Sequence, residues 1–273
     1  MKASKPLKIH GGKHYLAPWI IEHFPPHIQY VEPFFGGGSV LFAKPPELIV
    51  GHSEVVNDID GDLMNFWSVL QNKEQFPRLA RYAAVTPFSR ARWLKSLSGI
   101  YDVDPVWRAL HFLVKYRQSR QGLGTDWATL SRNRTRGGMN EQVSAWLSAI
   151  DGLPEFHERL QRVAIENLPA LEVIRKQDGE NTLFYCDPPY APSTRTAGKY
   201  TYEMAEDDHE ELLDTLADIK GYFILSGYWS EMYEAYSDKY GWFEDWKEID
   251  NKASSSKKKK KKREYLWMNF DPS

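Results

Sequence analysis

Residues 182–190, TLFYCDPPY, constrain the fold of this chain more than any other stretch. Five mostly apolar residues predict a short buried strand, and the two prolines after Asp187 end it because proline cannot donate to a strand ladder. A rigid turn therefore follows a strand, with an acid before the prolines and an aromatic ring after them. In open α/β sheets, ligands bind at the carboxyl ends of the strands.

Such a turn suits chemistry on a planar base with an exocyclic amine. Asp187 can accept a hydrogen bond from the amine, and the Pro188 carbonyl can accept a second one. Tyr190, which follows Pro189 in the rigid turn, can stack on the ring, as aromatic side chains do around flipped bases. Taken alone, these residues also fit an ordinary strand-ending turn with a surface acid and a packed tyrosine.

Composition narrows the class of protein. With 273 residues, the chain is long enough for one or two domains, and its single cysteine, Cys186, excludes an internal disulfide and a cysteine-based metal cluster. No apolar run reaches the length of a membrane span, and the start lacks the apolar stretch of a signal peptide. We therefore expect a protein of a reducing, cytoplasmic compartment, without a metal and without a membrane partner.

Two glycine motifs precede the turn. Residues 7–13, LKIHGGK, put a Gly-Gly turn before Lys13, which lets backbone amides and an ammonium group approach an anion. Residues 30–42, YVEPFFGGGSVLF, predict a strand, a glycine-rich turn and the start of a helix that Ser39 could cap. Because the third glycine of the dinucleotide fingerprint is missing, this turn favours another adenosine-bearing ligand over NAD.

Acids follow the next expected strand. Residues 54–60, EVVNDID, end in Asp58 and Asp60, at the position where nucleotide-binding sheets hold ribose hydroxyls. Asp58 is the first choice for this role and Asp60 the alternative. Residues 63–70 carry apolar side chains at helical spacing and predict a packed helix.

These motifs, in this order and spacing, resemble the DNA adenine-N6 methyltransferases of the Dam type, whose pattern is close to LKWAGGK, EPFxGxGSVF, xADIN and DPPY. The resemblance covers about residues 7–70 and 181–230. It implies a Rossmann-like α/β methyltransferase sheet that binds S-adenosylmethionine and releases S-adenosylhomocysteine. Ile9 departs from the family, which often has tryptophan there, and Asp60 stands where the family usually has asparagine.

The resemblance also assigns roles to residues. The catalytic turn is Asp187, Pro188, Pro189 and Tyr190. The implied cofactor site takes in Ile9, Lys13, Glu32, Phe34, Gly36, Gly38, Ser39, Asp58 and Asp187.

The middle of the chain has a different character. It lacks the βαβ spacing and predicts helices at residues 76–85, 89–97, 105–116, 140–150 and 155–163. Between Trp107 and Gly138 there are seven arginines or lysines against one acid, Asp126, and such segregated charge suggests a polyanion partner. Because the family carries target recognition in this interval, we expect a mainly helical recognition domain at 71–165, inserted between catalytic parts at 1–70 and 166–273.

Arginine binds phosphate and guanine, and glutamine and asparagine read adenine. The expected DNA-binding residues are therefore Arg117, Arg120, Gln121, Arg132, Asn133, Arg134 and Arg136, together with Arg195 and Lys199 in the loop after the catalytic turn. For each one, a solvated surface position is the alternative.

The remainder predicts an amphipathic helix at 209–216, capped by Asp207 or Asp208, and strands at 222–228, 242–249 and 263–270. His209 is a candidate base or a structural histidine. Seven consecutive basic residues, 257–263, follow a serine run and could add nonspecific, salt-dependent affinity for DNA.

The sequence therefore predicts a methyltransferase acting on the N6 amine of a flipped adenine in double-stranded DNA, with or without a cognate restriction endonuclease as partner. Two alternatives remain at this point. One is a methyltransferase acting on another nucleic-acid amine, either RNA adenine or DNA cytosine N4. The other is a DNA-binding protein on the same fold that no longer catalyses.

Overall fold

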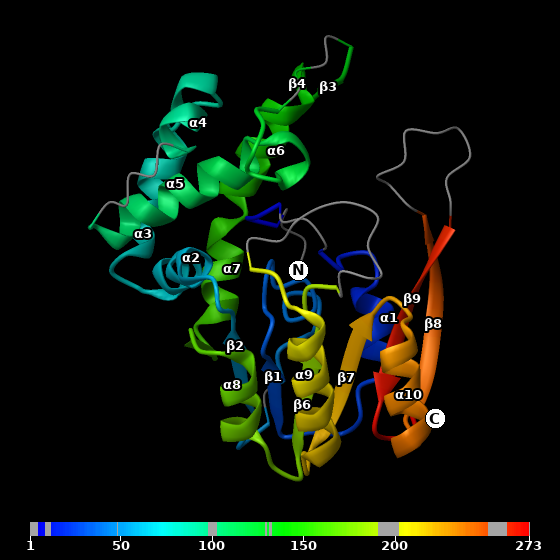
Figure 1. Ribbon diagram of the computed structural model, residues 1–273. Coiled ribbons are helices and arrows are strands. Elements are labelled where there is room, and N and C mark those ends of the chain that lie inside the picture. The colour runs from blue at the N-terminus through cyan, green and yellow to red at the C-terminus, as the bar shows by residue number, and fades with distance from the viewer. Residues whose placement is uncertain are drawn as a thin grey trace. The chain divides into compact units, whose positions relative to one another are not determined.

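The computed structural model in Figure 1 describes residues 5–8, 12–47, 49–97, 103–128, 130, 133–190, 202–250 and 261–272. The chain forms two compact units, each assembled from separate segments. Unit 1 comprises Met1–Pro18, Gly36–Glu47 and Asp60–Asn167; unit 2 comprises Trp19–Phe35, Leu48–Ile59 and Leu168–Ser273. Within the described residues, no helix is long and apolar enough to cross a membrane.

Unit 2 is built on a mainly parallel sheet. Its strands follow the order β2-β1-β6-β7-β9-β8. The first four run parallel, and β9 is antiparallel to both β7 and β8. The strands are β1 (Gln29–Glu32), β2 (Ser53–Asn57), β6 (Thr182–Cys186), β7 (Tyr222–Gly227), β8 (Phe243–Asp250) and β9 (Lys261–Met268). This mixed α/β architecture confirms the expected Rossmann-like class.

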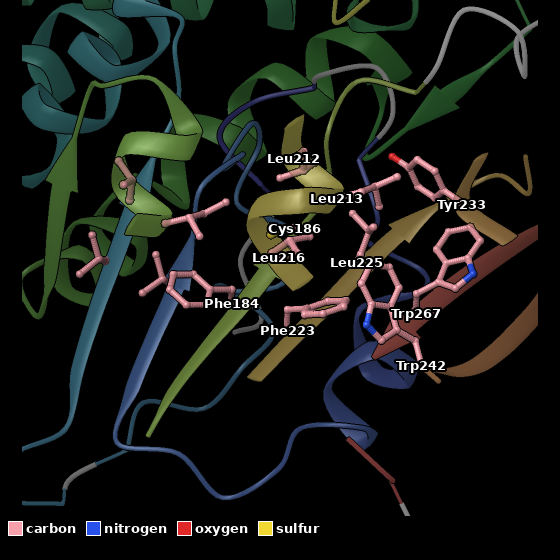
Figure 2. Close-up of a cluster of buried hydrophobic side chains, with 14 residues drawn as sticks. Phe184, Cys186, Leu212, Leu213, Leu216, Phe223, Leu225, Tyr233, Trp242 and Trp267 are labelled. Atoms are coloured by element: carbon pink, nitrogen blue, oxygen red, sulfur yellow. The ribbon is translucent and has the colours of Figure 1, made fainter. Parts of the chain in front are cut away.

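Three helices cover one face of this sheet: α8 (Ala170–Gln177), α9 (Glu206–Asp218) and α10 (Glu231–Tyr240). Leucines of α9 recur at helical spacing and pack with Phe184, Phe223 and Trp267 from the strands, as Figure 2 shows. Because this apolar layer anchors β6 and β7 along their length, the turns at their carboxyl ends stand on a rigid base.

Helix α1 (Ala17–Glu22) leads into unit 2. The indole of Trp19 donates to Asp245 on β8 over 2.9 Å, and His23 lies 3.0 Å from the same carboxylate. These contacts tie the start of the unit to its antiparallel end.

Unit 1 is mainly helical. Its elements are α2 (Gly61–Gln71), α3 (Phe76–Val85), α4 (Arg90–Leu97), α5 (Pro105–Arg117), the short 3₁₀ helix η1 (Arg120–Gly122), β3 (Thr135–Arg136), β4 (Met139–Asn140), α6 (Glu141–Asp151), α7 (Leu153–Leu160) and β5 (Val163–Glu166). Buried aromatic rings join α2 to α5, where Phe66 and Phe112 stack with ring centroids 6.1 Å apart.

Several sequence expectations need correction. Residues 163–166 form β5, although the sequence predicted a helix to 163; Val163 and Ile165 are apolar, and so short an apolar segment does not distinguish the end of a helix from a strand. Residues 39–44 form turns instead of the expected helix start. Helix α9 begins after Ala205, and Asp208 accepts a hydrogen bond from the Ala205 amide over 2.7 Å from the third position of the helix.

The division into units differs from the expected domain bounds. The expected recognition region, 71–165, lies inside unit 1, which also contains the glycine-rich loop and α2. We keep 71–165 as a proposal for the part that reads DNA.

Candidate functional site

The catalytic turn follows β6, whose five residues are all buried. Asp187 is half-buried at the end of this strand, and its Oδ1 accepts a hydrogen bond from Ser226 Oγ of β7 over 3.1 Å. The Tyr185 hydroxyl lies 3.1 Å from the same Ser226 oxygen. A chain of three polar side chains therefore fixes the carboxylate at the carboxyl ends of two parallel strands.

Burial sets the protonation of the groups beneath the turn. Burial, with a smaller contribution from the charge of Asp187, raises the pKa of the Cys186 thiol well above its ordinary value. The thiol therefore stays protonated and is a poor nucleophile.

His209 of α9 lies in the same layer. It is fully buried, and its Nδ1 lies 2.9 Å from the hydroxyl of Tyr233, whose pKa is raised mainly by burial. These contacts give His209 a structural role.

Tyr190 is held at its hydroxyl end. The hydroxyl donates to Glu264 of β9, at 3.0 Å from Oε1 and 3.3 Å from Oε2. The ring packs against Tyr228 at the end of β7, with centroids 4.4 Å apart and planes at 39°. Pro188 is buried and Pro189 half-buried, so the turn itself has little freedom.

A second set of candidate residues follows β1. Glu32 is buried and accepts from the Tyr30 hydroxyl over 2.7 Å. Phe34 is half-buried against the core cluster. The Phe35 amide donates to the Asn57 carbonyl over 2.8 Å, and the Asn57 amide group donates to the Pro33 carbonyl over 3.0 Å. These bonds lock the ends of β1 and β2 side by side.

The glycine-rich loop needs glycine for its backbone. Gly36 and Gly38 have φ of 49° and 64°, a left-handed conformation that other residues rarely adopt. A Cβ on Gly36 would meet no described atom within 4 Å. The loop is anchored in unit 1, where Trp67 donates to the Gly36 carbonyl over 3.1 Å and Lys5 donates to Ser39 over 2.7 Å.

The two candidate acids after β2 have different surroundings. Asp60 is the N-cap of α2 and accepts from the amides of Asp62 and Leu63 over 2.9 and 3.2 Å. Burial is the main cause that raises the pKa of its carboxyl. Asp58 is half-buried at the end of β2. Since capping accounts for Asp60, Asp58 remains the acid that we propose for ligand binding.

Lys13 is buried, and its carbonyl accepts from the amides of Leu16 and Ala17 at the start of α1. Ile9 lies outside the described residues, as do Arg132, Arg195 and Lys199 of the expected DNA-binding set.

The expected DNA-binding residues of unit 1 divide by burial. Arg117 is buried and donates to the Ala145 carbonyl over 2.7 Å, and burial lowers its pKa to about 10. This environment indicates a role inside the helical unit, and corrects the expectation that Arg117 faces DNA. Arg120 and Gln121 are exposed, and Gln121 has a φ of 55°.

The second half of the basic segment forms a β-hairpin. Strands β3 and β4 pair around Gly137 and Gly138, whose φ values of 60° and 74° match a type I′ turn. Arg136 is exposed on β3, and Asn133 and Arg134 are exposed just before that strand. Figure 1 shows the hairpin extending away from α6. At the base of the hairpin, the Arg134 guanidinium lies 3.6 Å from the Glu141 carboxylate.

Three residues of the site were not predicted: Ser226, Tyr228 and Glu264. Glu264 had a signal in the sequence, because strand alternation places it on the same face as Leu266 and Met268. A carboxylate on a buried face needs a partner. In the sequence, Ser226 and Tyr228 have no signal beyond their place at the end of a predicted strand.

Comparison with known proteins identifies the family of this chain. A sequence model for D12 class N6 adenine-specific DNA methyltransferases matches residues 10–254. A DNA adenine methylase of Vibrio cholerae is 29% identical over 217 residues, which cover 76% of this chain and 74% of that protein. A DNA adenine methylase of Escherichia coli is 28% identical over 204 residues, covering 72% and 68%. A DNA N-6-adenine-methyltransferase of Escherichia phage P1 is 25% identical over 211 residues, covering 74% of this chain and 26% of that protein.

Proposed function

The chain belongs to the D12 class N6 adenine-specific DNA methyltransferases, and from that premise we propose which of its residues bind the methyl donor, the target base and the DNA. Its activity is the methylation of adenine in DNA. This activity replaces the RNA, cytosine and silent alternatives that the sequence left open. The finer assignments below are ours.

We propose S-adenosylmethionine as the methyl donor. The residues fit an adenosine-bearing ligand, because a left-handed glycine loop with open space at Gly36 lets a ligand lie against the backbone, and Asp58 offers a carboxylate at the strand end where ribose is held. When bound, this cofactor supplies an electrophilic methyl group on a sulfonium centre. The residues that we propose to hold it are Lys13, Glu32, Phe34, Gly36, Gly38, Ser39, Asp58 and Asp187, and Ile9 stays in the proposal on sequence grounds.

The target is proposed to be an adenine flipped out of double-stranded DNA. Tyr190 stacks on the base. Asp187 and the Pro188 carbonyl each accept a hydrogen bond from the exocyclic amine and draw its nitrogen towards a tetrahedral, nucleophilic geometry. The same two acceptors stabilise the positive charge that develops on nitrogen. Catalysis is therefore mainly positioning and preorganised electrostatics.

DNA contact is proposed for the exposed basic residues of unit 1. Arg120, Arg134 and Arg136 carry charge that can neutralise phosphates, while Gln121 and Asn133 have the amide groups that suit adenine. An exposed hairpin such as β3–β4 has the dimensions to enter a major groove. Arg132, Arg195 and Lys199 stay in the proposal on sequence grounds.

One observation carries the catalytic proposal. Asp187 and Tyr190, which flank the two prolines, each have their polar end hydrogen-bonded to a buried residue of another strand of the sheet, Ser226 on β7 and Glu264 on β9. Such support leaves the carboxylate and the ring preorganised before a base arrives.

Labelled S-adenosylmethionine tests the proposal with four acceptors of mixed sequence: duplex DNA, single-stranded DNA, RNA, and duplex DNA already methylated on adenine. We expect label in N6-methyladenine from the duplex, with little transfer to RNA or to the premethylated control. Cofactor titrations with Asp58→Ala and Asp60→Ala test the cofactor site, since only the Asp58 variant should lose affinity. Preferential methylation of RNA would overturn the proposal that duplex DNA is the substrate. Unchanged cofactor affinity in Asp58→Ala would overturn the assignment of Asp58 to the cofactor site.

A further inference from the structure

We infer that Glu264 is a positioning residue for Tyr190. The inference rests on the proposed role of Tyr190 as the platform for the target base. Glu264 lies on β9, 74 residues further along the chain than Tyr190. Both oxygens of its carboxylate accept a hydrogen bond from the Tyr190 hydroxyl, at 3.0 and 3.3 Å. Only 1% of Glu264 is exposed.

A buried carboxylate in this place is costly unless it is well bonded. Apolar side chains of the same strand face, such as Leu266 and Met268, are also fully buried. A leucine or methionine at 264 would continue that face without any desolvation cost. The carboxylate therefore contributes something that an apolar residue would not, and its contact with the catalytic turn indicates what that is.

The contact fixes both the end and the plane of the ring. The hydrogen bond holds the hydroxyl, and Tyr228 packs against the ring with centroids 4.4 Å apart. Lys262, two residues before Glu264 on β9, lies over the Tyr228 ring at 4.3 Å and steadies the second aromatic side chain. Stacking strength depends on ring orientation. Glu264 thus sets the surface on which the flipped adenine is held, although it touches neither base nor cofactor.

The test is a double-mutant cycle of Glu264→Gln and Tyr190→Phe. Glutamine keeps the size and one acceptor oxygen but loses the charge, and a charge-assisted bond is about twice as strong as a neutral one. We expect Glu264→Gln to lower kcat by about tenfold. A tenfold change in rate corresponds to about 1.4 kcal/mol of activation free energy. The KM for DNA should change little, because phosphate contacts dominate affinity. In the Tyr190→Phe background, Glu264→Gln should have no further effect on kcat.

A second readout follows the base itself. Duplex DNA with 2-aminopurine at the target position becomes fluorescent when that base leaves the stack. Glu264→Gln should lower the fluorescence amplitude of the bound complex, while Glu244→Gln, at an exposed carboxylate, serves as the control for the loss of charge. Glu244 is on the neighbouring strand β8 and accepts from the Trp267 indole over 2.8 Å, so the same substitution removes a charge without involving Tyr190.

The outcomes separate the two proposals. Additive effects of Glu264→Gln and Tyr190→Phe, or equal effects of Glu264→Gln and Glu244→Gln, would overturn the role of Glu264. Full activity and full fluorescence in Tyr190→Ala would instead overturn the role of Tyr190. Thermal unfolding of each variant shows whether it is folded. Tyr190→Phe alone leaves the buried carboxylate without this donor, so adding Glu264→Gln to it should raise the melting temperature.

Discussion

The catalytic turn and the β3–β4 hairpin carry the two halves of the proposed function, and they differ in how their side chains are supported. Asp187 and Tyr190 are tied to Ser226 and Glu264, which lie in the buried interior of a sheet. The hairpin has strands of two residues each, and its basic side chains are exposed.

The difference fits what each region is proposed to do. Transfer to an amine requires acceptors in place before the reaction, since reorganising them would raise the barrier. Contact with phosphate requires charge at a roughly correct distance, and long exposed side chains can adapt to the backbone of DNA. A rigid turn and an exposed hairpin are therefore expected to respond differently to substitution.

The largest effect is expected at the turn. Asp187→Ala should lower kcat by about 10²- to 10³-fold, the scale found when one preorganised electrostatic group is removed. Thermal unfolding should change little, because Asp187 is half-buried at the end of its strand. Methyl transfer under saturating DNA and cofactor checks the first point. Substantial activity in a folded Asp187→Ala protein would contradict the role of this acid.

The next largest effect is a difference in stability between two glycine substitutions, one in the buried part of the basic segment and one in the hairpin. Gly122 has a φ of 75°, and a Cβ there would approach the Lys8 carbonyl oxygen at 2.1 Å. Gly137 in the hairpin has a φ of 60° but would meet no described atom within 4 Å. Both substitutions by alanine carry backbone strain of about 1–3 kcal/mol, and only Gly122→Ala adds the collision.

Urea unfolding should therefore give a clearly lower free energy of unfolding for Gly122→Ala than for Gly137→Ala. Equal free energies of unfolding would mean that the backbone around Lys8 moves away from the new Cβ without loss of stability.

A third substitution tests the hairpin. Arg134→Ala with Arg136→Ala should weaken DNA binding by about tenfold or more at physiological salt and reduce the slope of log affinity against log salt by about two. The kcat at saturating DNA should be nearly unchanged. The charge-matched control is Arg175→Ala with Lys176→Ala on α8, where both side chains are exposed. The same loss of slope in this control would show that net charge, and not the hairpin, is responsible.

The smallest effect concerns the acid that caps α2. Asp60→Ala should lower the free energy of unfolding by about 0.5–2 kcal/mol, while Asp60→Asn should retain most of the capping hydrogen bonds. Because burial raises the pKa of Asp60, the folded protein binds its proton more tightly than the unfolded chain does, and the stability that this proton contributes is lost as pH rises through the folded pKa. Asparagine does not titrate.

The stability of the wild type relative to Asp60→Asn should therefore be greatest at low pH and fall as pH rises. Urea unfolding of both proteins from about pH 3.5 to pH 7 measures this difference. A difference that grows with pH would show that the capping bonds outweigh burial.

Local sequence was sufficient for the parts of the molecule where chemistry restricts the choice of residue. Two prolines can only end a strand, so the turn at Asp187 could be predicted, and the periodicity of α3 and α9 indicated helices close to those observed. The mixed α/β class followed from the same motifs.

Other features depend on contacts between distant residues. Arg117 looks like its exposed neighbours in sequence, yet it is buried against α6 through the Ala145 carbonyl. Gly137-Gly138 carries the signal of a type I′ turn, but the strands beside it are too short to show alternation. Ser226 and Glu264 become part of the site only through the pairing of β7 with β6 and β9, which no local pattern specifies.

The position of β9 also has a consequence for biosynthesis. Strand β9 is made after β8, yet it lies between β7 and β8 in the sheet. During synthesis, β8 cannot join the sheet until β9, the strand that links it to β7, has been made. The hydrogen bond from the Tyr190 hydroxyl likewise cannot form until Glu264 has been made. A nascent chain stalled before residue 264 can already contain every motif that marks the family, although the hydroxyl of Tyr190, the proposed platform for the base, has not yet bonded to Glu264.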